Sequence, residues 1–279
     1  MDGEICYRSL RRLATSYGVL VGAPLVLKNK KSLGQNWLKD RQLLDLIASY
    51  AKTPDVNLCL EIGPGLGTLT SSLLKLFPKV LAVEFDENLA KNLPKSFPGK
   101  NLEVINADFL NFDLEKIKEP YVVAGNIPYY ITSPIIMKLL EAGNRPEKIV
   151  LLVQKEVAER IVAKKGDHTL LSLSVQNLAT VDLGAIIERN FFTPPPKVDS
   201  QVIILTPHAQ TVEKEAIRLA KIGFSSPRKK LINNLGYKTQ DILPLFKELK
   251  LSPDARPSDL DLKDWQKLYN SLAKFKHKS

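Results

Sequence analysis

Short apolar runs alternate with segments of helical periodicity over the first three quarters of the chain. Polar or turn-forming residues bound each run, as expected of strands buried inside a sheet. The runs cover residues 57–62, 80–83, 102–106, 121–124, 149–153 and 201–205, and helices are expected between them at residues 68–76, 87–93, 133–140, 156–163 and 170–179. This alternation predicts an α/β fold in which a parallel sheet carries helices on both faces.

The pattern changes after Pro207, where apolar positions recur at helical spacing. We expect helices there at residues 213–223, 226–235, 241–249 and 262–275, and a short helix near the start of the chain at residues 4–17. The chain therefore divides into a basic N-terminal arm of residues 1–31, an α/β domain of residues 32–206 and a helical domain of residues 207–279.

A glycine-rich loop joins the first apolar run to its helix. Residues 63–67 read Gly-Pro-Gly-Leu-Gly, and glycines allow both a tight turn and the close approach of a ligand to the backbone. The spacing differs from the Gly-x-Gly-x-x-Gly of dinucleotide-binding folds, and the Lys-Ser/Thr pair of a P-loop is absent. The loop therefore favours a nucleoside ligand over a pyrophosphate.

Acidic residues follow the next two strands. Glu84 ends the second run, where a carboxylate can bind both hydroxyls of a ribose; alternatively, Glu84 and Asp86 only cap the following helix. After the third run, Asp108 can accept a hydrogen bond from an adenine amine while Phe109 covers the ring. Together the three strand ends indicate an adenosine-like ligand.

The fourth strand ends in the loop Asn-Ile-Pro-Tyr. Asn126 offers an amide oxygen, and Pro128 biases Ile127 toward an extended backbone that can direct its carbonyl outward. Tyr129 adds an aromatic ring on which a base can stack. These residues predict a pocket for the exocyclic amine of a nucleobase, although a turn after a strand with a tyrosine covering the core is the simpler alternative.

Two other segments are candidates for the same site. Gln35 and Asn36 precede a helix that Asp40 is expected to cap, so they either line a polar ligand at the helix entry or form a turn. Three prolines at residues 194–196 make a stiff approach to the last strand. This approach either presents Phe192 to a ligand or packs it in the core.

The net charge is +10, and the two ends of the chain carry the excess. Residues 1–39 have 7 basic and 2 acidic side chains, residues 40–205 have 18 and 20, and residues 206–279 have 15 and 8. Basic segments flanking a neutral core suggest a catalytic domain held on a polyanion such as nucleic acid, because neutralising phosphates supplies much of the affinity. A solubilising surface is the alternative.

Three basic residues stand out in the helical domain. Arg228, Lys229 and Lys230 fall in the first turn expected for the helix at residues 226–235. Cations oppose the dipole at a helix N-terminus. Their placement there indicates an anionic partner.

The cysteine count and hydropathy bear on the compartment. Cys6 and Cys59 are the two cysteines of the chain, too few for a disulfide framework or a cysteine-rich zinc site. No apolar run is long enough to span a membrane. These features predict a cytoplasmic protein with no membrane partner.

Four segments together resemble a known family. They are residues 60–67 (Leu-Glu-Ile-Gly-Pro-Gly-Leu-Gly), 126–129 (Asn-Ile-Pro-Tyr), 154–156 (Gln-Lys-Glu) and 192–200 (Phe-Thr-Pro-Pro-Pro-Lys-Val-Asp-Ser). The combination is similar to the small-subunit ribosomal RNA adenine dimethyltransferases, the KsgA family, and the likeness extends over most of the chain after the N-terminal arm.

The resemblance implies an S-adenosylmethionine-dependent enzyme that dimethylates N6 of two adjacent adenosines in the 3′-terminal hairpin of small-subunit rRNA. It implies a Rossmann-like methyltransferase domain at residues 32–206, a helical RNA-binding domain at residues 207–279, and a monomer that acts on a pre-ribosomal small subunit without a metal. The implied cofactor contacts are Asn36, Leu38, Gly63, Gly65, Glu84, Asp108, Phe109 and Asn126. The implied catalytic residues are Asn126, Ile127, Tyr129 and Phe192, of which the two aromatic residues hold the base, and the implied RNA contacts are Arg228, Lys229 and Lys230.

Two other functions are compatible with parts of this pattern. A large-subunit rRNA dimethylase shares the cofactor site, but Pro64 and the proline run at residues 194–196 favour the small-subunit class. A nonenzymatic assembly factor or transcription factor with the same fold would bind nucleic acid through its basic ends, and the intact Asn-Ile-Pro-Tyr loop argues against it.

Overall fold

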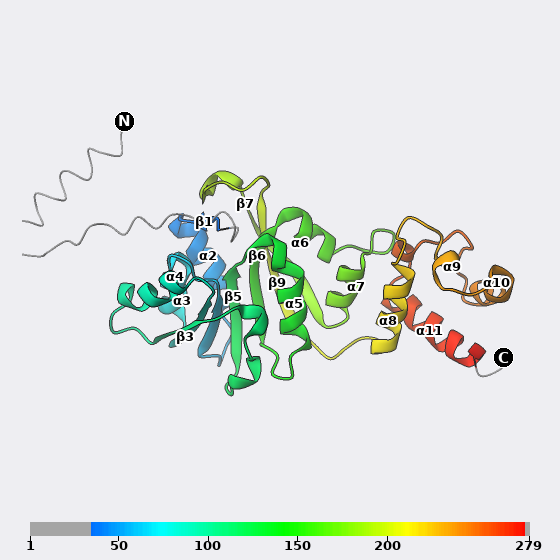
Figure 1. Ribbon diagram of the computed structural model, residues 1–279, viewed down its shortest axis with the longest axis horizontal. Coiled ribbons are helices and arrows are strands. Elements are labelled where there is room, and N and C mark those ends of the chain that lie inside the picture. The colour runs from blue at the N-terminus through cyan, green and yellow to red at the C-terminus, as the bar shows by residue number, and fades with distance from the viewer. Residues whose placement is uncertain (1–34, 277–279) are drawn as a thin grey trace, which may run out of the picture. The chain divides into compact units, whose positions relative to one another are not determined.

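The structure is a computed structural model that describes residues 35–276 (Figure 1). The N-terminal arm of residues 1–31, with the helix expected at residues 4–17, lies outside the described residues.

Seven strands form the central sheet, in the order β4-β3-β2-β5-β6-β9-β7. They are β2 (Leu58–Ile62), β3 (Lys79–Glu84), β4 (Leu102–Asn106), β5 (Tyr121–Asn126), β6 (Lys148–Gln154), β7 (Ala179–Ile187) and β9 (Ser200–Pro207). The strands from β4 to β6 are parallel, whereas β9 is antiparallel to both of its neighbours. The prediction of a parallel sheet is therefore confirmed for these five strands and wrong for β9, which follows β7 without a helical crossover.

The edge strand β7 was not predicted. Its sequence interrupts the apolar pattern with Asp182 and Gly184, and the pairing with β9 is irregular between Leu183 and Ile186. The helix expected at residues 170–179 ends earlier, as α7 (Leu170–Gln176). An edge strand with one solvated face and a bulge has no clean period of two, so its sequence resembles a loop.

Helices cover both faces of the sheet, because alternate residues of each strand point to opposite sides. On β5, Val122 and Ala124 pack with α2 (Arg41–Ala51) and α3 (Thr68–Leu76). Tyr121 and Val123 pack on the other face, with α5 (Thr132–Glu141) and α6 (Lys155–Ile161). A further helix, α4 (Glu87–Asn92), follows β3. The three-layer architecture is a Rossmann-like fold, as predicted.

Helix starts follow the capping residues in the sequence. The side chain of Asp40 accepts a hydrogen bond from the backbone N–H of Leu43 at 2.9 Å and caps α2, as predicted. The next helix, α3, begins directly after Gly67, whose φ of 80° lies in the left-handed region. A side chain at position 67 would also collide with Leu93, so this turn requires glycine.

A second, two-stranded sheet joins distant parts of the chain. Strand β1 (Trp37–Leu38) pairs antiparallel with β8 (Phe192–Thr193), and Leu38 lies opposite Phe192. Both side chains are buried in the core on the α2 side. This pairing places the segment before α2 beside the segment that leads to β9.

The helices after β9 form a separate core around Trp265. They are α8 (Lys214–Gly223), α9 (Leu231–Asn234), α10 (Thr239–Glu248) and α11 (Leu262–Lys276). Trp265 has no exposed surface, and its ring lies 6.2 Å from that of Phe224. The buried Leu173 of α7 belongs to the same core. The helical domain therefore packs directly on the α/β domain through α7.

The helix expected at residues 226–235 is wrong in its extent. Residues 224–229 form a turn, and only α9 is helical. The Asn234 side-chain amide donates to the carbonyls of Gly223 and Ser226 at 2.6 and 3.0 Å, and the Leu231 N–H donates to Ala255. These contacts hold the turn open and override the local N-cap and proline signals.

Replacing Gly223 with alanine should destabilise this core by about 1–3 kcal/mol, because an added Cβ meets the ring of Trp265 and lies 2.8 Å from Leu231 Cδ1. Thermal unfolding measures the loss. The exposed Ser225→Ala variant is the control, and equal melting temperatures for both variants would contradict the packing argument.

Candidate active site at the ends of the central strands

Four neighbouring strands end along one edge of the sheet. Ile62 on β2 pairs with Gly125 on β5, and Glu84 on β3 pairs with Asn106 on β4. Because β4, β3, β2 and β5 are consecutive in the sheet, the segments that follow them lie in the same order along the edge. The structure thereby brings together Asp108, Glu84, the glycine loop and Asn126.

The glycine loop is built for a close approach to its backbone. Gly63 has φ of 64°, and an added Cβ there would meet nothing within 4 Å. Gly65 has φ of 57°, and an added Cβ would lie 3.2 Å from Trp37 Nε1. Trp37 thus lies against the loop on one side while Gly63 opens to space. Trp37 lies between the predicted cofactor contacts Asn36 and Leu38 but was not itself predicted to contact the cofactor.

Glu84 fixes the loop from the next strand. Its carboxylate is 5% exposed and accepts hydrogen bonds from the N–H groups of Gly65 at 2.9 Å and Asp86 at 2.8 Å. Burial raises the pKa of Glu84, whereas these N–H groups favour its charged form. Helix capping is done instead by Asp86, which accepts from the N–H of Asn88. Each Glu84 oxygen still has acceptor capacity for a ribose hydroxyl.

Asp108 and Phe109 follow β4 but are engaged locally. Asp108 accepts hydrogen bonds from the N–H of Leu110 and the side chain of Asn111, both at 2.9 Å. Phe109 is 5% exposed and lies in the core, with its ring 6.4 Å from that of Phe112. The structure therefore does not open the face of Phe109 as a cover for a ring. Its predicted contact with the cofactor stays a prediction.

The Asn126 loop is tied to the start of the described chain. The Asn126 side-chain Nδ2 donates to the backbone carbonyl of Asn36 at 2.9 Å, which leaves Oδ1 as the acceptor of the amide. Ile127 is 2% exposed and anchors the loop in the core. Asn126 thus lies beside the glycine loop with its amide oriented by a partner 90 residues away in sequence.

Tyr129 is held by a second residue that sequence reasoning did not single out. Its hydroxyl lies 2.7 Å from the hydroxyl of Ser200, a residue with no exposed surface at the start of β9. The ring of Tyr129 is half-buried, and the next residue, Tyr130, is 66% exposed. This hydrogen bond fixes the direction of the Tyr129 ring.

Phe192 lies in the core rather than open to a ligand. Its side chain is 3% exposed and packs with Leu38 and Val202 because β8 pairs with β1. The simpler alternative, core packing, describes this position better. A role for Phe192 in holding a base stays a prediction that requires its edge to become accessible.

The three basic residues of the helical domain lie on the surface. Arg228 and Lys229 are exposed in the turn at residues 224–229. Lys230 precedes α9 and forms an ion pair with Asp254 at 2.5 Å. Helix α9 has four residues and starts after all three basic residues. The prediction that these cations lie in the first turn of a helix and oppose its dipole is therefore wrong. Their exposure still leaves two cations open to an anionic partner.

A buried acid lies behind the glycine loop. Glu61 is 1% exposed, and burial raises its pKa to about 8, with Thr70 favouring the charged form and Glu84 disfavouring it. Glu61 is therefore protonated at neutral pH, where an exposed glutamate is charged.

Glu61 should make the stability of the protein fall as pH rises. Between its ordinary pKa of 4.5 and about 8, the folded chain keeps the proton that the unfolded chain has released, so the free energy of unfolding declines by up to about 1.4 kcal/mol per pH unit. Glu61→Gln removes this decline, and its melting temperature should rise relative to the parent between pH 5 and pH 8. The exposed Glu103→Gln variant should keep the same melting-temperature difference from the parent at every pH. If the difference between Glu61→Gln and the parent is also constant with pH, the raised pKa is contradicted.

Neither a metal site nor a membrane-spanning helix is found in the part of the chain that the structure describes. No group of three or more His, Cys, Asp or Glu residues within residues 35–276 is placed to hold a metal ion. Among the same residues, no helix combines the length and apolar character that crossing a membrane requires.

Comparison with known proteins identifies similar chains. The model of the family described as ribosomal RNA adenine dimethylase matches residues 26–274. Ribosomal RNA small subunit methyltransferase A of Dehalococcoides mccartyi (strain CBDB1) is 38% identical over 255 residues, covering 87% of this chain and 88% of the relative.

Two solved structures of RNA-modifying or adenosine-modifying methyltransferases by name are also similar to this chain. A dimethyladenosine transferase from Plasmodium falciparum superposes with a TM-score of 0.74 at 29% identity, covering 86% of this chain and 98% of that one. The 23S rRNA methyltransferase ErmE superposes with a TM-score of 0.68 at 28% identity, covering 85% and 100%.

Proposed function

This chain belongs to the ribosomal RNA adenine dimethylase family and is a methyltransferase, and from that premise we propose that it dimethylates N6 of two adjacent adenosines in the 3′-terminal hairpin of small-subunit rRNA. S-adenosylmethionine is the proposed methyl donor. The observation that carries the proposal is the row of four strand ends, in which the glycine loop and the Asn126 amide are neighbours. Membership of this family of methyltransferases argues against a nonenzymatic nucleic-acid-binding protein.

The small-subunit RNA is favoured over the large-subunit RNA. The relative from D. mccartyi is named a small-subunit methyltransferase, and the dimethyladenosine transferase from P. falciparum superposes with a higher TM-score than the 23S rRNA methyltransferase ErmE, 0.74 against 0.68. Incubating the chain with purified unmodified small and large subunits and tritiated donor separates the two classes. Label mapped to two adjacent adenosines of the small-subunit RNA supports the proposal, and label in the large-subunit RNA overturns it.

The cofactor site proposed here fits the residues present. The open space at Gly63 admits a ligand against the backbone, and Glu84 retains acceptor capacity for ribose hydroxyls. Asn36 and Leu38 stand on either side of Trp37, which lies against the loop, and Asp108 follows β4, two strands away from β2. S-adenosylmethionine, when bound, supplies an electrophilic methyl group.

Asn126 and Ile127 act on the amine of the target base in this proposal. The N6 lone pair of adenine is delocalised into the ring, so the amine is a poor nucleophile. Hydrogen bonds from N6–H to Asn126 Oδ1 and to the Ile127 carbonyl localise that lone pair and orient it for in-line attack. Because Asn126 Nδ2 is already bound to Asn36, the amide cannot rotate freely and Oδ1 faces a fixed direction.

The target adenosine must leave its stack to reach these acceptors. Extruding a base costs a few kcal/mol, and stacking on an aromatic ring returns about 1–3 kcal/mol. Tyr129 is the proposed stacking surface, because its ring is partly accessible and held by Ser200.

Ser200→Ala should lower kcat/KM about tenfold, because the Tyr129 hydroxyl loses its partner and the ring is no longer fixed. Tyr129→Phe should cause a similar loss, and the double variant should be no worse than either single variant. Steady-state methyl transfer to small subunits measures all three. Additive losses would show that the two residues act separately.

The setting of the reaction is also part of the proposal. We propose a monomer that acts in the cytoplasm on a small subunit during its assembly, gripping the RNA through Arg228 and Lys229 with a smaller part for the ion-paired Lys230. Sedimentation of the chain alone and with small subunits tests the monomer and the partner together.

A further inference from the structure

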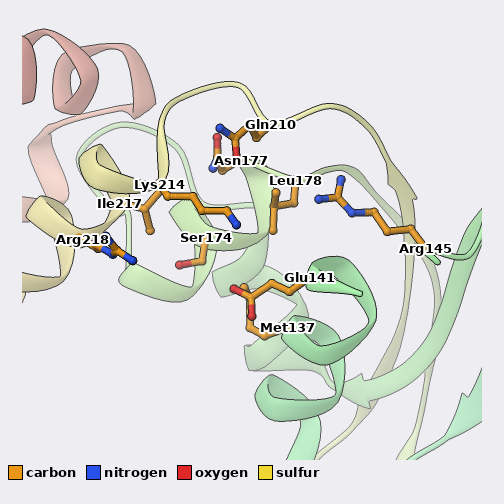
Figure 2. A pocket seen from close by; sticks show the side chains of 10 residues that line it. All are labelled: Met137, Glu141, Arg145, Ser174, Asn177, Leu178, Gln210, Lys214, Ile217 and Arg218. Atoms are coloured by element: carbon orange, nitrogen blue, oxygen red, sulfur yellow. The ribbon is translucent and has the colours of Figure 1, made fainter. Parts of the chain in front are cut away.

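A cavity of about 450 Å³ lies between α5, α7 and α8, away from the Asn126 loop (Figure 2). Ser200 pairs with Gln154 at the catalytic edge of the sheet, so Pro207, at the other end of β9, marks the opposite edge. There Pro207 pairs with Ala179, directly after the cavity residue Leu178. The cavity is therefore at the far end of the sheet from the proposed methyl-transfer site.

The cavity has an excess of positive charge. Arg145, Lys214 and Arg218 line it, against the single carboxylate of Glu141. Arg218 is partly neutralised by Glu215, whose carboxylate is 3.1 Å away. The side chain of Lys214 has no hydrogen bond or ion pair with any residue between 35 and 276, and its ammonium group points into the cavity (Figure 2).

The walls of the cavity are preformed. Arg145 Nη1 donates to the carbonyl of His208 at 3.0 Å, which anchors the guanidinium and leaves its other N–H groups for a ligand. Asn177 Oδ1 accepts from the N–H groups of Thr211 and Val212 at 2.9 and 2.8 Å, which fixes the loop above the cavity. A ligand would therefore enter the cavity without ordering this loop first.

Three apolar side chains are spread around the cavity. Leu178 and Ile217 lie on either side of the Lys214 side chain, and Met137 lies next to Glu141 (Figure 2). The volume is within the range of small-molecule sites, about 300–1,000 Å³, and it exceeds what a bare phosphate fills. The ammonium of Lys214 with the apolar side chains of Leu178 and Ile217 next to it suits a ligand that joins an anionic group to a flat ring.

We propose that this cavity binds the phosphate of a nucleotide at Lys214, with the base and sugar against the neighbouring Leu178 and Ile217. A lysine suits a phosphate, since its ammonium is a compact charge with three donors. The nucleotide is either free or a unit of the bound RNA. The RNA source rests on the proposed function, whereas the phosphate site does not.

Calorimetric titration of the full chain with uridine 5′-monophosphate tests the free nucleotide. Saturating S-adenosylhomocysteine keeps the proposed cofactor site occupied, and a pyrimidine avoids competition there. Lys214→Ala should raise the Kd at least fivefold, as expected for a lost charge-assisted hydrogen bond. Lys221→Ala, an exposed residue of the same helix outside the lining, should leave the Kd unchanged.

A second measurement tests the RNA source. The salt dependence of binding to a small-subunit RNA fragment should fall by about one released ion in Lys214→Ala and not in Lys221→Ala. Weaker binding of uridine 5′-monophosphate in Lys214→Ala alone supports a site for a free nucleotide, and a smaller salt dependence in Lys214→Ala alone supports a site for a unit of the RNA. If neither quantity changes, or if both variants change equally, the proposed site is overturned. Methyl transfer, assayed in parallel, reports on the proposed function independently, since neither binding measurement depends on it.

Discussion

Asn126→Ala should reduce methyl transfer to small subunits by about 100- to 1,000-fold, the cost of removing one oriented hydrogen-bonding group from a transition state. Asn126 Oδ1 is the proposed acceptor of one N6 hydrogen, and the alanine variant leaves the amine without it. Binding of S-adenosylmethionine should weaken only moderately, because the glycine loop and Glu84 remain in place. Single-turnover methyl transfer and calorimetry give the two quantities separately.

The Asn126→Asp variant separates the two roles of the side chain. It keeps an acceptor oxygen but loses the Nδ2 donor that binds the Asn36 carbonyl. If orientation by Asn36 matters, the methyl-transfer rate of Asn126→Asp should lie between the rates of the parent and of Asn126→Ala. Full activity of Asn126→Ala would remove Asn126 from the mechanism altogether.

Glu84→Ala should weaken S-adenosylmethionine binding by about 100-fold. The substitution removes the proposed acceptor for the ribose, and it also leaves the N–H groups of Gly65 and Asp86 without their partner. Each unpaired buried N–H costs about 1–3 kcal/mol, so the glycine loop should also lose its fixed shape. Calorimetry measures the affinity, and thermal unfolding without cofactor measures the structural part of the loss.

Glu87→Ala is the matched control for this change. Glu87 lies in the first turn of α4, three residues further on, and is exposed. Cofactor affinity in this variant should stay within about twofold of the parent. An equal loss in Glu87→Ala and Glu84→Ala would attribute the effect to general charge rather than to the carboxylate at the end of β3.

The central strands were predictable because each buries both faces and therefore forms a continuous apolar run. The helix α3 also begins at the predicted residue, since Gly67 interrupts the backbone just before it. By contrast, β7 has exposed positions and an irregular pairing that hide its period. Local patterns thus reveal the central strands and the regularly paired edge strand β4, which has its predicted bounds, and they miss β7, whose bulge interrupts the pattern.

The same division applies to the candidate site. Glu84 and Asn126 could be located from sequence because each immediately ends a strand. Partners that arrive through tertiary pairing could not: Asn36 reaches Asn126 across 90 residues, and Ser200 reaches Tyr129 across 71. Burial of Phe192 was one of two alternatives that the sequence left open, and the two-residue pairing of β8 with β1 decides between them.

The packing of Leu173 of α7 into the core around Trp265 has a consequence for substrate choice. Because the helical domain and the catalytic domain share this packed contact, the span from Arg228 to Asn126 is set by the protein and not by the RNA. In the proposed function, a hairpin whose stem is lengthened or shortened by a few base pairs would still bind to Arg228 and Lys229 but would present a different nucleotide to Asn126.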